Sequence, residues 1–237
     1  MNRRKLLQVA GATFATGIGT GYTGARQDGG ENDEPADEPP EECFCDPEIQ
    51  FGEQELLIDE SGFTPDAYAV VEVENAGDTP TSELTVSVSW MDEDGQFIGD
   101  DSERLPSLAA DELWRAYVWT ITDPEEIDDF ELSGEFEVGQ PRTPSGLTIA
   151  DSNFDYGENE ITGVVENSRD SDIERVKAHG KMFDDGGTVL GGGSTWEREH
   201  PAGRDWNFDI RVPRLPGGVE PTEHEVMLDA RTFQIQG

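Results

Sequence analysis

The sequence predicts an all-β protein with two tandem antiparallel β-sandwich domains, and three observations support this prediction. Apolar and polar residues alternate with a period of two over several short segments. Gly, Asp, Asn and Pro separate these segments, as expected for strands joined by turns. The second half of the chain repeats the first at an offset of 92 residues, and helical periodicity is nearly absent. This combination favours a sandwich in each half.

Alternating segments occupy corresponding places in the two halves. In the first half, Leu84, Val86, Val88 and Trp90 alternate with Thr and Ser, and segment 176–182 takes the same place in the second half. A period of two is typical of strands with one buried face. The tryptophans that this alternation places in the two cores are Trp90, Trp114 and Trp206.

The repeat sets the domain boundaries. At the offset of 92 residues, Asn75 falls on Asn167, and the surrounding segments align without a gap. Internal duplication is the simplest account of this match. The segment Gln140–Pro144 contains two prolines and predicts a stiff link. We therefore predict one β-sandwich domain over 49–140 and a second over 146–237.

The acidic stretch Asp92-Glu93-Asp94-Gly95 suggests either a calcium loop or a hairpin turn. An EF-hand loop needs an oxygen ligand at its first position and glycine at its sixth, and that register puts Trp90 first. Both halves keep an Asp that enters the turn and a Gly that leaves it, Asp184 and Gly187 in the second. This pattern predicts two hairpin turns and no metal site, with solvent cations held only loosely at the acidic surface.

The N-terminus predicts export. Arg3 and Arg4 precede two leucines and a short, weakly apolar run that ends in small residues, which resembles a twin-arginine signal over 1–25. The run is too short and too rich in Gly and Thr for a permanent membrane span. We therefore expect export by the twin-arginine route to an extracellular or cell-surface location.

Residues 26–48 consist mainly of Pro, Gly and acidic residues and predict a disordered acidic linker. The linker holds the only two cysteines, Cys43 and Cys45. A Cys-x-Cys pair makes a strained intrachain disulfide, and two thiols are too few for a closed zinc site. Whether these cysteines are lipidated, bridged to a partner or free stays open, as do the oligomeric state and whether and where the signal is cleaved.

The charge of the chain indicates a salty solvent. There are 53 acidic residues against 16 basic ones, a formal charge of -37, and only three of the bases are lysines. Such self-repulsion destabilises a compact state unless salt screens it. We therefore expect a halophilic protein. We expect no cluster of Lys or Arg beyond the first five residues, and hence no nucleic acid partner, since phosphate binding needs a basic patch.

No catalytic pattern is found in the sequence. The histidines His179, His200 and His224 form no metal-binding spacing, and we expect them to face solvent or to lie in turns. The run Gly191–Ser194 lacks the lysine of a phosphate loop and predicts a flexible loop or bulge. No nucleophile elbow occurs. We therefore expect no enzyme activity and no cofactor.

A further pattern in the second half is formed by Gly163, Val165, Asn167, Phe183, Asp184, Gly187, Val189, Leu190 and Gly191. This pattern resembles the FxLYD-type module of exported prokaryotic proteins, here in a haloarchaeal-type tandem pair. In the first half Val71 and Met91 replace two motif residues, so that half matches less well. The resemblance implies an immunoglobulin-like sandwich, an envelope or surface location, and no catalytic residue.

Together these observations predict a non-enzymatic exported protein of the cell surface or envelope, a binding or structural module adapted to high salt. Its partner is an unknown envelope protein or glycan. The alternative is a solute- or glycan-binding protein with an aromatic cleft between the domains. Trp119 and Trp196 lie outside the buried alternation and are the candidate binding residues for such a cleft. A hydrolase would require two carboxylates converging in a buried cleft.

Overall fold

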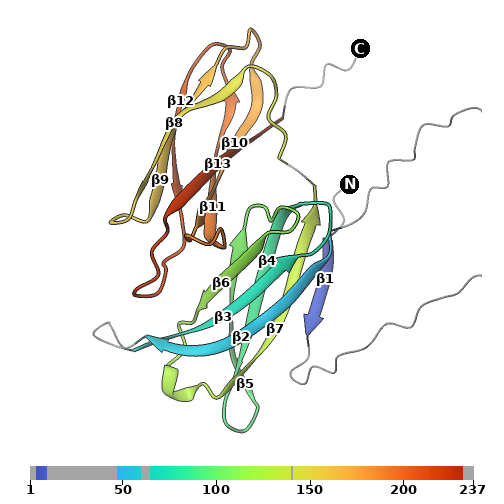
Figure 1. Ribbon diagram of the computed structural model, residues 1–237, viewed down its shortest axis with the longest axis vertical. Coiled ribbons are helices and arrows are strands. Elements are labelled where there is room, and N and C mark those ends of the chain that lie inside the picture. Colours follow the sequence, from blue (N-terminus) through green and yellow to red (C-terminus); the bar gives the residue numbers. More distant parts are fainter. Residues whose placement is uncertain (1–3, 10–46, 60–64, 140, 232–237) are drawn as a thin grey trace, which may run out of the picture.

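The computed structural model describes residues 4–9, 47–59, 65–139 and 141–231 (Figure 1). This part of the chain is built almost wholly from strands, so the all-β sandwich fold is confirmed. One short 3-10 helix, η1, covers Pro124–Glu126, with Asp123 as its cap. The strands are β1 (Arg4–Val9), β2 (Ile49–Asp59), β3 (Asp66–Asn75), β4 (Thr81–Met91), β5 (Phe97–Leu105), β6 (Leu113–Trp119), β7 (Asp129–Val138), β8 (Leu147–Asp155), β9 (Glu160–Asn167), β10 (Ile173–Phe183), β11 (Val189–His200), β12 (Trp206–Arg211) and β13 (Glu223–Arg231).

The strands form two sandwiches, one on each side of the link 139–146. In the first, a sheet of order β1-β7-β4-β5 packs on strands β6, β3 and β2. In the second, the sheet β12-β9-β8 packs on β13, β10 and β11. A single parallel pairing, Val189 with Trp114, connects β11 to β6 and so joins the two sandwiches in one six-stranded sheet. Figure 1 shows the second sandwich seated on one end of the first.

The internal repeat reappears in the strand boundaries. Strands β4 and β10 begin and end 92 residues apart, and β5 and β11 begin 92 residues apart. The buried faces also correspond. Trp90 and Trp114 are enclosed in the first core, as predicted, and Met182, the counterpart of Trp90, is enclosed in the second. Trp206 is half-buried at the edge of the second core, where it packs on Phe208.

Both acidic turns are hairpin turns closed by the side chain of their first Asp. Asp92 Oδ1 accepts hydrogen bonds from the N–H groups of residues 94 and 96, and Asp184 Oδ1 accepts from those of residues 186 and 188. Gly95 and Gly187 have φ of 70° and 81°, a region that side chains disfavour. The four residues thus lie in the two tips, between β4 and β5 and between β10 and β11.

A buried asparagine closes each sandwich at the end of β3 or β9. Asn75 Nδ2 donates to the carbonyls of Thr79, Leu108 and Ala109. Asn167 Nδ2, its counterpart, donates to Pro201 O, which lies 92 residues after Ala109. Each asparagine Oδ1 also accepts from the N–H group two residues on. The amide therefore ties the loop after β5 to the end of β3, and the loop after β11 to the end of β9.

The N-terminal segment is described only in part. Strand β1 lies within the predicted signal and pairs antiparallel with β7 at the edge of the first sandwich. Arg3, the linker up to residue 46, and both cysteines lie outside the described residues. The export signal therefore stays a prediction. In the described residues no helix is long and apolar enough to cross a membrane.

Candidate functional site at the domain junction

An aromatic cluster fills the contact between the two sandwiches. On strand β3 the residues Ala69, Val71 and Val73 point into the first core, so Tyr68 and Val70 occupy the outer face of the sheet. That outer face packs on the start of β11 and on the loop before β13. The members of this junction cluster are Leu57, Tyr68, Val70, Tyr117 and Trp119 from the first sandwich, and Leu190, Leu215 and Val219 from the second.

Trp119 belongs to this junction and not to an open aromatic cleft. Its ring lies 4.5 Å from that of Tyr68, and the Arg214 guanidinium lies 4.3 Å from its centroid. Its Nε1 donates to Arg214 O at 3.0 Å. Arg214 also contacts two carboxylates of the first sandwich, Asp66 at 2.9 Å and Asp59 at 3.5 Å. The indole therefore fastens the second sandwich to the first.

The glycine run lies in strand β11, in part at the same contact, so the expected flexible loop is wrong. The other expectation, a bulge, agrees with the register shift between β10 and β11 directly before the run. Gly191–Gly193 lie in strand β11, where other atoms approach closely. A Cβ on Gly192 would stand 2.5 Å from Gly180 O and 3.0 Å from a Pro106 carbon, and one on Gly193 would stand 2.1 Å from Arg211 O. Only glycine fits such distances. The sequence showed the run but not the neighbours that require it.

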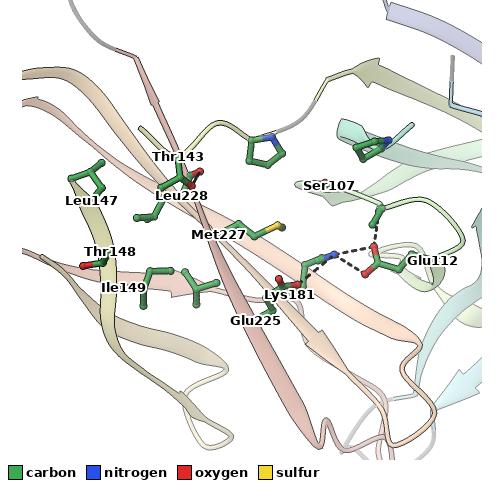
Figure 2. Close-up of a pocket in the computed structure, with 14 residues that line it drawn as sticks. Ser107, Glu112, Thr143, Leu147, Thr148, Ile149, Lys181, Glu225, Met227 and Leu228 are labelled. Atoms are coloured by element: carbon green, nitrogen blue, oxygen red, sulfur yellow. Dashed lines mark hydrogen bonds and ion pairs between the residues drawn. The ribbon is translucent and has the colours of Figure 1, made fainter. Parts of the chain in front are cut away.

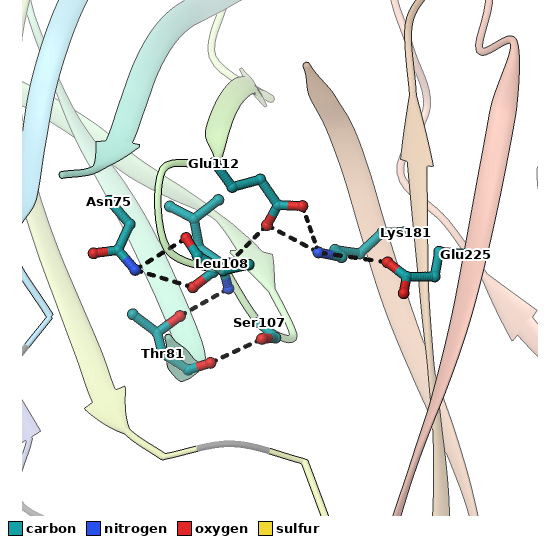
Figure 3. A network of polar contacts seen from close by, with 8 residues as sticks. Asn75, Thr81, Ser107, Leu108, Glu112, Lys181 and Glu225 are labelled. Carbon is teal, nitrogen blue, oxygen red and sulfur yellow. Dashed lines mark hydrogen bonds and ion pairs between the residues drawn. The ribbon is translucent and has the colours of Figure 1, made fainter. Parts of the chain in front are cut away.

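A buried ion pair spans the junction. Lys181 on β10 is 1% exposed, and its Nζ lies 2.7 and 2.9 Å from the two carboxylate oxygens of Glu112. Glu225 lies further away at 4.0 Å. Glu112 belongs to the loop after β5, which the first sandwich holds in place (Figure 3). Thr81 binds Ser107 and Leu108 of that loop, and Ala109 N donates to Glu112 Oε2. Beyond the rarity of lysine, nothing in the sequence indicated this pair.

A pocket of about 640 Å³ opens beside the ion pair. Figure 2 shows Leu147 and Ile149 at one end and Lys181 with Glu112 at the other. The pocket is lined by Pro80, Ser107, Ala109, Glu112, Pro141, Thr143, Leu147, Thr148, Ile149, Lys181, Glu225, Val226, Met227 and Leu228. None of these is aromatic, and neither predicted binding tryptophan is among them. At the domain junction the protein therefore has an aliphatic and charged pocket, where the alternative prediction expected an aromatic cleft.

The histidines are less exposed than expected. His179 is 3% exposed and His200 is fully buried, so the expectation of solvent-facing or turn positions is wrong for both. Burial, together with the charge of Lys177, lowers the pKa of His179 to about 4, although Asp229 opposes this shift. His200 Nδ1 lies 2.6 Å from Glu197 Oε2, and His224 Nε2 lies 3.0 Å from Ser152 Oγ. Strand periodicity alone does not show which outer faces a second domain covers.

Burial also shifts the pKa of other titratable groups. It lowers the pKa of Lys177 against the opposing effect of Glu83, and it raises the pKa of Tyr117 in the junction cluster. It raises the pKa of Glu103 as well, and the N–H and charge of Arg104 oppose that change. In the described part of the chain, no group of three or more His, Cys, Asp and Glu side chains is arranged to hold a metal ion.

The two sandwiches differ sharply in charge. Residues 49–138 contain 25 acids and two bases, whereas residues 147–231 contain 18 acids and nine bases. Three of the latter, Arg175, Lys177 and Lys181, alternate along β10, which contradicts the expectation of no basic cluster. They were missed because each is separated from the next by residues of the opposite face. Trp196 lies on the neighbouring β11 and is 53% exposed, with the Arg198 guanidinium 4.9 Å from its ring centroid.

The comparisons with known proteins add little. A scan of protein-family models and a search of curated proteins both find no match. Among solved structures, the chain is similar to red sea bream transglutaminase at 12% identity and a TM-score of 0.23. The similarity covers 75% of this chain and 29% of that one, so this chain spans less than a third of its length. A likeness this weak carries no argument.

Proposed function

We propose that the chain is a non-enzymatic, exported protein of the cell surface or envelope, a binding or structural module adapted to high salt. The observation that carries the proposal is the locked junction. Domains in one chain move relative to each other by default unless their interface is large and apolar. Here an aromatic cluster, a strand pairing and a buried ion pair all span the same contact. Two sandwiches fixed in this way form a rigid unit that suits presentation or spacing at a surface.

The ion pair fixes the register of the two sandwiches. Removing Lys181 alone would leave the Glu112 carboxylate largely buried and without its partner, and breaking a buried pair in this way costs roughly 3–5 kcal/mol. Glu112 retains 14% of its side-chain exposure, so the lower end of that range applies. The loop that holds Glu112 is tied to Thr81, so the carboxylate is already placed for the lysine. The junction is therefore held in one arrangement by the first sandwich itself.

A thermal unfolding experiment tests the rigid unit. In molar salt the protein should unfold in one cooperative transition, whereas Lys181→Met should lose about 3 kcal/mol and split the transition in two. The double variant Lys181→Met/Glu112→Gln serves as the control. It leaves no unpaired buried charge and should recover most of the loss. A single transition in Lys181→Met with unchanged stability would count against the locked junction.

Export is tested on whole cells. The two linker cysteines are the only thiols of the chain. A membrane-impermeant maleimide, added after mild reduction, should label the exported protein on intact cells. The variant Arg3→Lys/Arg4→Lys removes the predicted twin-arginine signal but keeps its charge, and labelling should then require lysis. Equal labelling of both forms on intact cells would contradict the twin-arginine route, and no labelling of either would contradict surface exposure.

The junction pocket supports a second candidate, capture of a small solute. Its charged end holds one ammonium and two carboxylates, and its other end is aliphatic. This arrangement favours a solute with one positive group and a short apolar part. Glycine betaine is a suitable probe, and trehalose a neutral control. A thermal shift with the first that disappears in Glu225→Gln would support capture, and no shift with either would exclude this pair of solutes.

A further inference from the structure

Three arginines stand abreast on one sheet of the second sandwich. Arg175 on β10 pairs in register with Arg198 on β11 and with Arg231 on β13. Strand β10 lies between these two strands in the sheet. The chain has only 16 bases, and like charges directly opposite each other destabilise a sheet. The contact of Arg198 with the Trp196 ring offsets part of this repulsion, but in the described residues no ion pair neutralises Arg175 or Arg198.

The row lies on the outer face of the sheet. Val176, Ala178 and Met182 of β10 point into the second core. Because strand side chains alternate between faces, Arg175, Lys177 and Lys181 share the opposite face. The outer face thus gathers the positive charge of the second sandwich.

Parts of that face are already neutralised. Lys181 is paired with Glu112, and Lys177 lies close enough to Glu83, Asp229 and Glu137 for their charges to raise its pKa, against the stronger effect of burial. The open part is at the far end from the junction. It consists of Arg175, which is half-buried, and the exposed Trp196 and Arg198. We call these three residues the arginine–tryptophan patch.

The patch offers unused charge and an open aromatic ring. In the described residues no carboxylate lies within ion-pair distance of either guanidinium, although acids outnumber bases threefold in the chain. Arg198 lies against the ring of Trp196, and Ser194 is exposed on the same strand. A half-exposed tryptophan with one guanidinium against its ring and a second beside it can bind a ring that carries an anion, on the ring face that Arg198 leaves open.

We propose that the arginine–tryptophan patch binds a carboxylated sugar unit of an acidic glycan. The pyranose ring would stack on Trp196, and its carboxylate would accept paired hydrogen bonds from Arg198 and Arg175. Guanidinium groups match a carboxylate in this two-point fashion. This inference specifies the ligand of the proposed binding role. It rests on the proposed function only for the location, the cell surface or envelope, at which the protein would meet that ligand.

Molar salt narrows the choice of anion. Screening within about 3 Å removes long-range attraction and leaves contact hydrogen bonds and stacking. The patch provides these contacts over roughly one sugar unit. A long polyanion such as nucleic acid gains its affinity mainly from many phosphate contacts, and acidic residues surround this patch. A short, ring-bearing carboxylate fits the patch better.

The test is calorimetric titration of the full chain in molar salt with a galacturonic acid tetrasaccharide. We expect binding of this probe and none of a neutral galactose tetrasaccharide. Arg198→Gln and Trp196→Ala should each weaken binding about tenfold, the loss expected for one charge-assisted contact or one stacking contact. The matched control is Arg204→Gln, which removes the same charge from an exposed turn of the same sandwich and should bind like the parent.

The remaining outcomes would overturn the proposal. These are no heat with the acidic tetrasaccharide, equal weakening in Arg204→Gln, and unchanged affinity in Arg198→Gln. Tighter binding of a tetra-glutamate peptide than of the sugar would assign the patch to an acidic protein segment instead. Because the titration uses purified protein, its failure leaves the export result untouched, and failure of export leaves the titration untouched.

Discussion

The two sandwiches share one scaffold and differ in what covers it. The first carries a net charge of -23 over 49–138, and the second carries -9 over 147–231. Their acidic turns, the bounds of β4 and β10, and their closing asparagines correspond at a constant offset of 92 residues. What the two copies keep is therefore the chemistry that shapes the backbone. The two copies differ in their surfaces. The surface of the first sandwich is almost wholly acidic and serves solvation, whereas that of the second carries basic side chains that make contacts.

Removal of salt should produce the largest difference in stability between the two sandwiches. At molar salt the Debye length is about 3 Å, and at 0.01 M it is about 30 Å, so the acids of each sandwich repel across its whole width at low salt. We expect the fold to be lost on dialysis to tens of millimolar salt, with the first sandwich opening at higher salt than the second. Hydrogen exchange followed peptide by peptide measures the order. Unchanged circular dichroism, or earlier opening of the second sandwich, would contradict the charge comparison.

The second largest difference should be in the loss of stability when each closing asparagine, Asn75 or Asn167, is replaced. Asn75 Nδ2 contacts three carbonyls, whereas Asn167 Nδ2 contacts one. Each buried carbonyl left without its donor costs about 1 kcal/mol or more. Asn75→Ala should therefore lower the free energy of unfolding by roughly 3 kcal/mol, and Asn167→Ala by about half of that or less. Chemical denaturation in molar salt compares them, and equal losses would show that the loop contacts of the first copy are not the source.

The strands and turns of the repeat could be predicted from the sequence because the patterns that specify them are local. Alternation over 84–90 and the Asp and Gly of each turn act within a few residues, so strand and turn positions follow directly. The buried Trp90 and Trp114 follow from the same alternation. Duplication strengthens each inference, because both copies must satisfy it.

The junction site could not be predicted from the sequence, because it depends on how the second sandwich packs on the first. Alternation placed Trp119 outside the core but could not show that Tyr68 and Arg214 cover it. The three arginines abreast lie on three strands that are far apart in sequence. Residue spacing along one chain does not reveal which strands pair, so a cluster across strands stays hidden.

An acid titration should distinguish the copies through His179, since its counterpart 92 residues earlier is Ser87. The folded-state pKa is about 4, below the ordinary value of 6.5, because burial disfavours the charged ring. The unfolded chain therefore binds the proton more readily between these values, and stability falls as pH falls through that window. Relative to His179→Leu, the parent should lose about 2 kcal/mol between pH 8 and pH 5. Parallel pH profiles of the two proteins would remove His179 as the cause, and the difference isolates it from the many carboxylates that titrate in the same range.

The turn glycines should show the smallest effects and the closest agreement between copies. Gly95 and Gly187 both have positive φ, and a Cβ added at either would meet nothing within 4 Å. Replacement by alanine therefore introduces backbone strain without a clash, about 1 kcal/mol at each site. Equal losses in Gly95→Ala and Gly187→Ala, measured by denaturation in molar salt, would show that the two tips are equivalent despite the different charge of their sandwiches. A much larger loss at Gly95 would mean that its three neighbouring acids strain the turn, and the separation of backbone chemistry from surface charge would then fail where the copies look most alike.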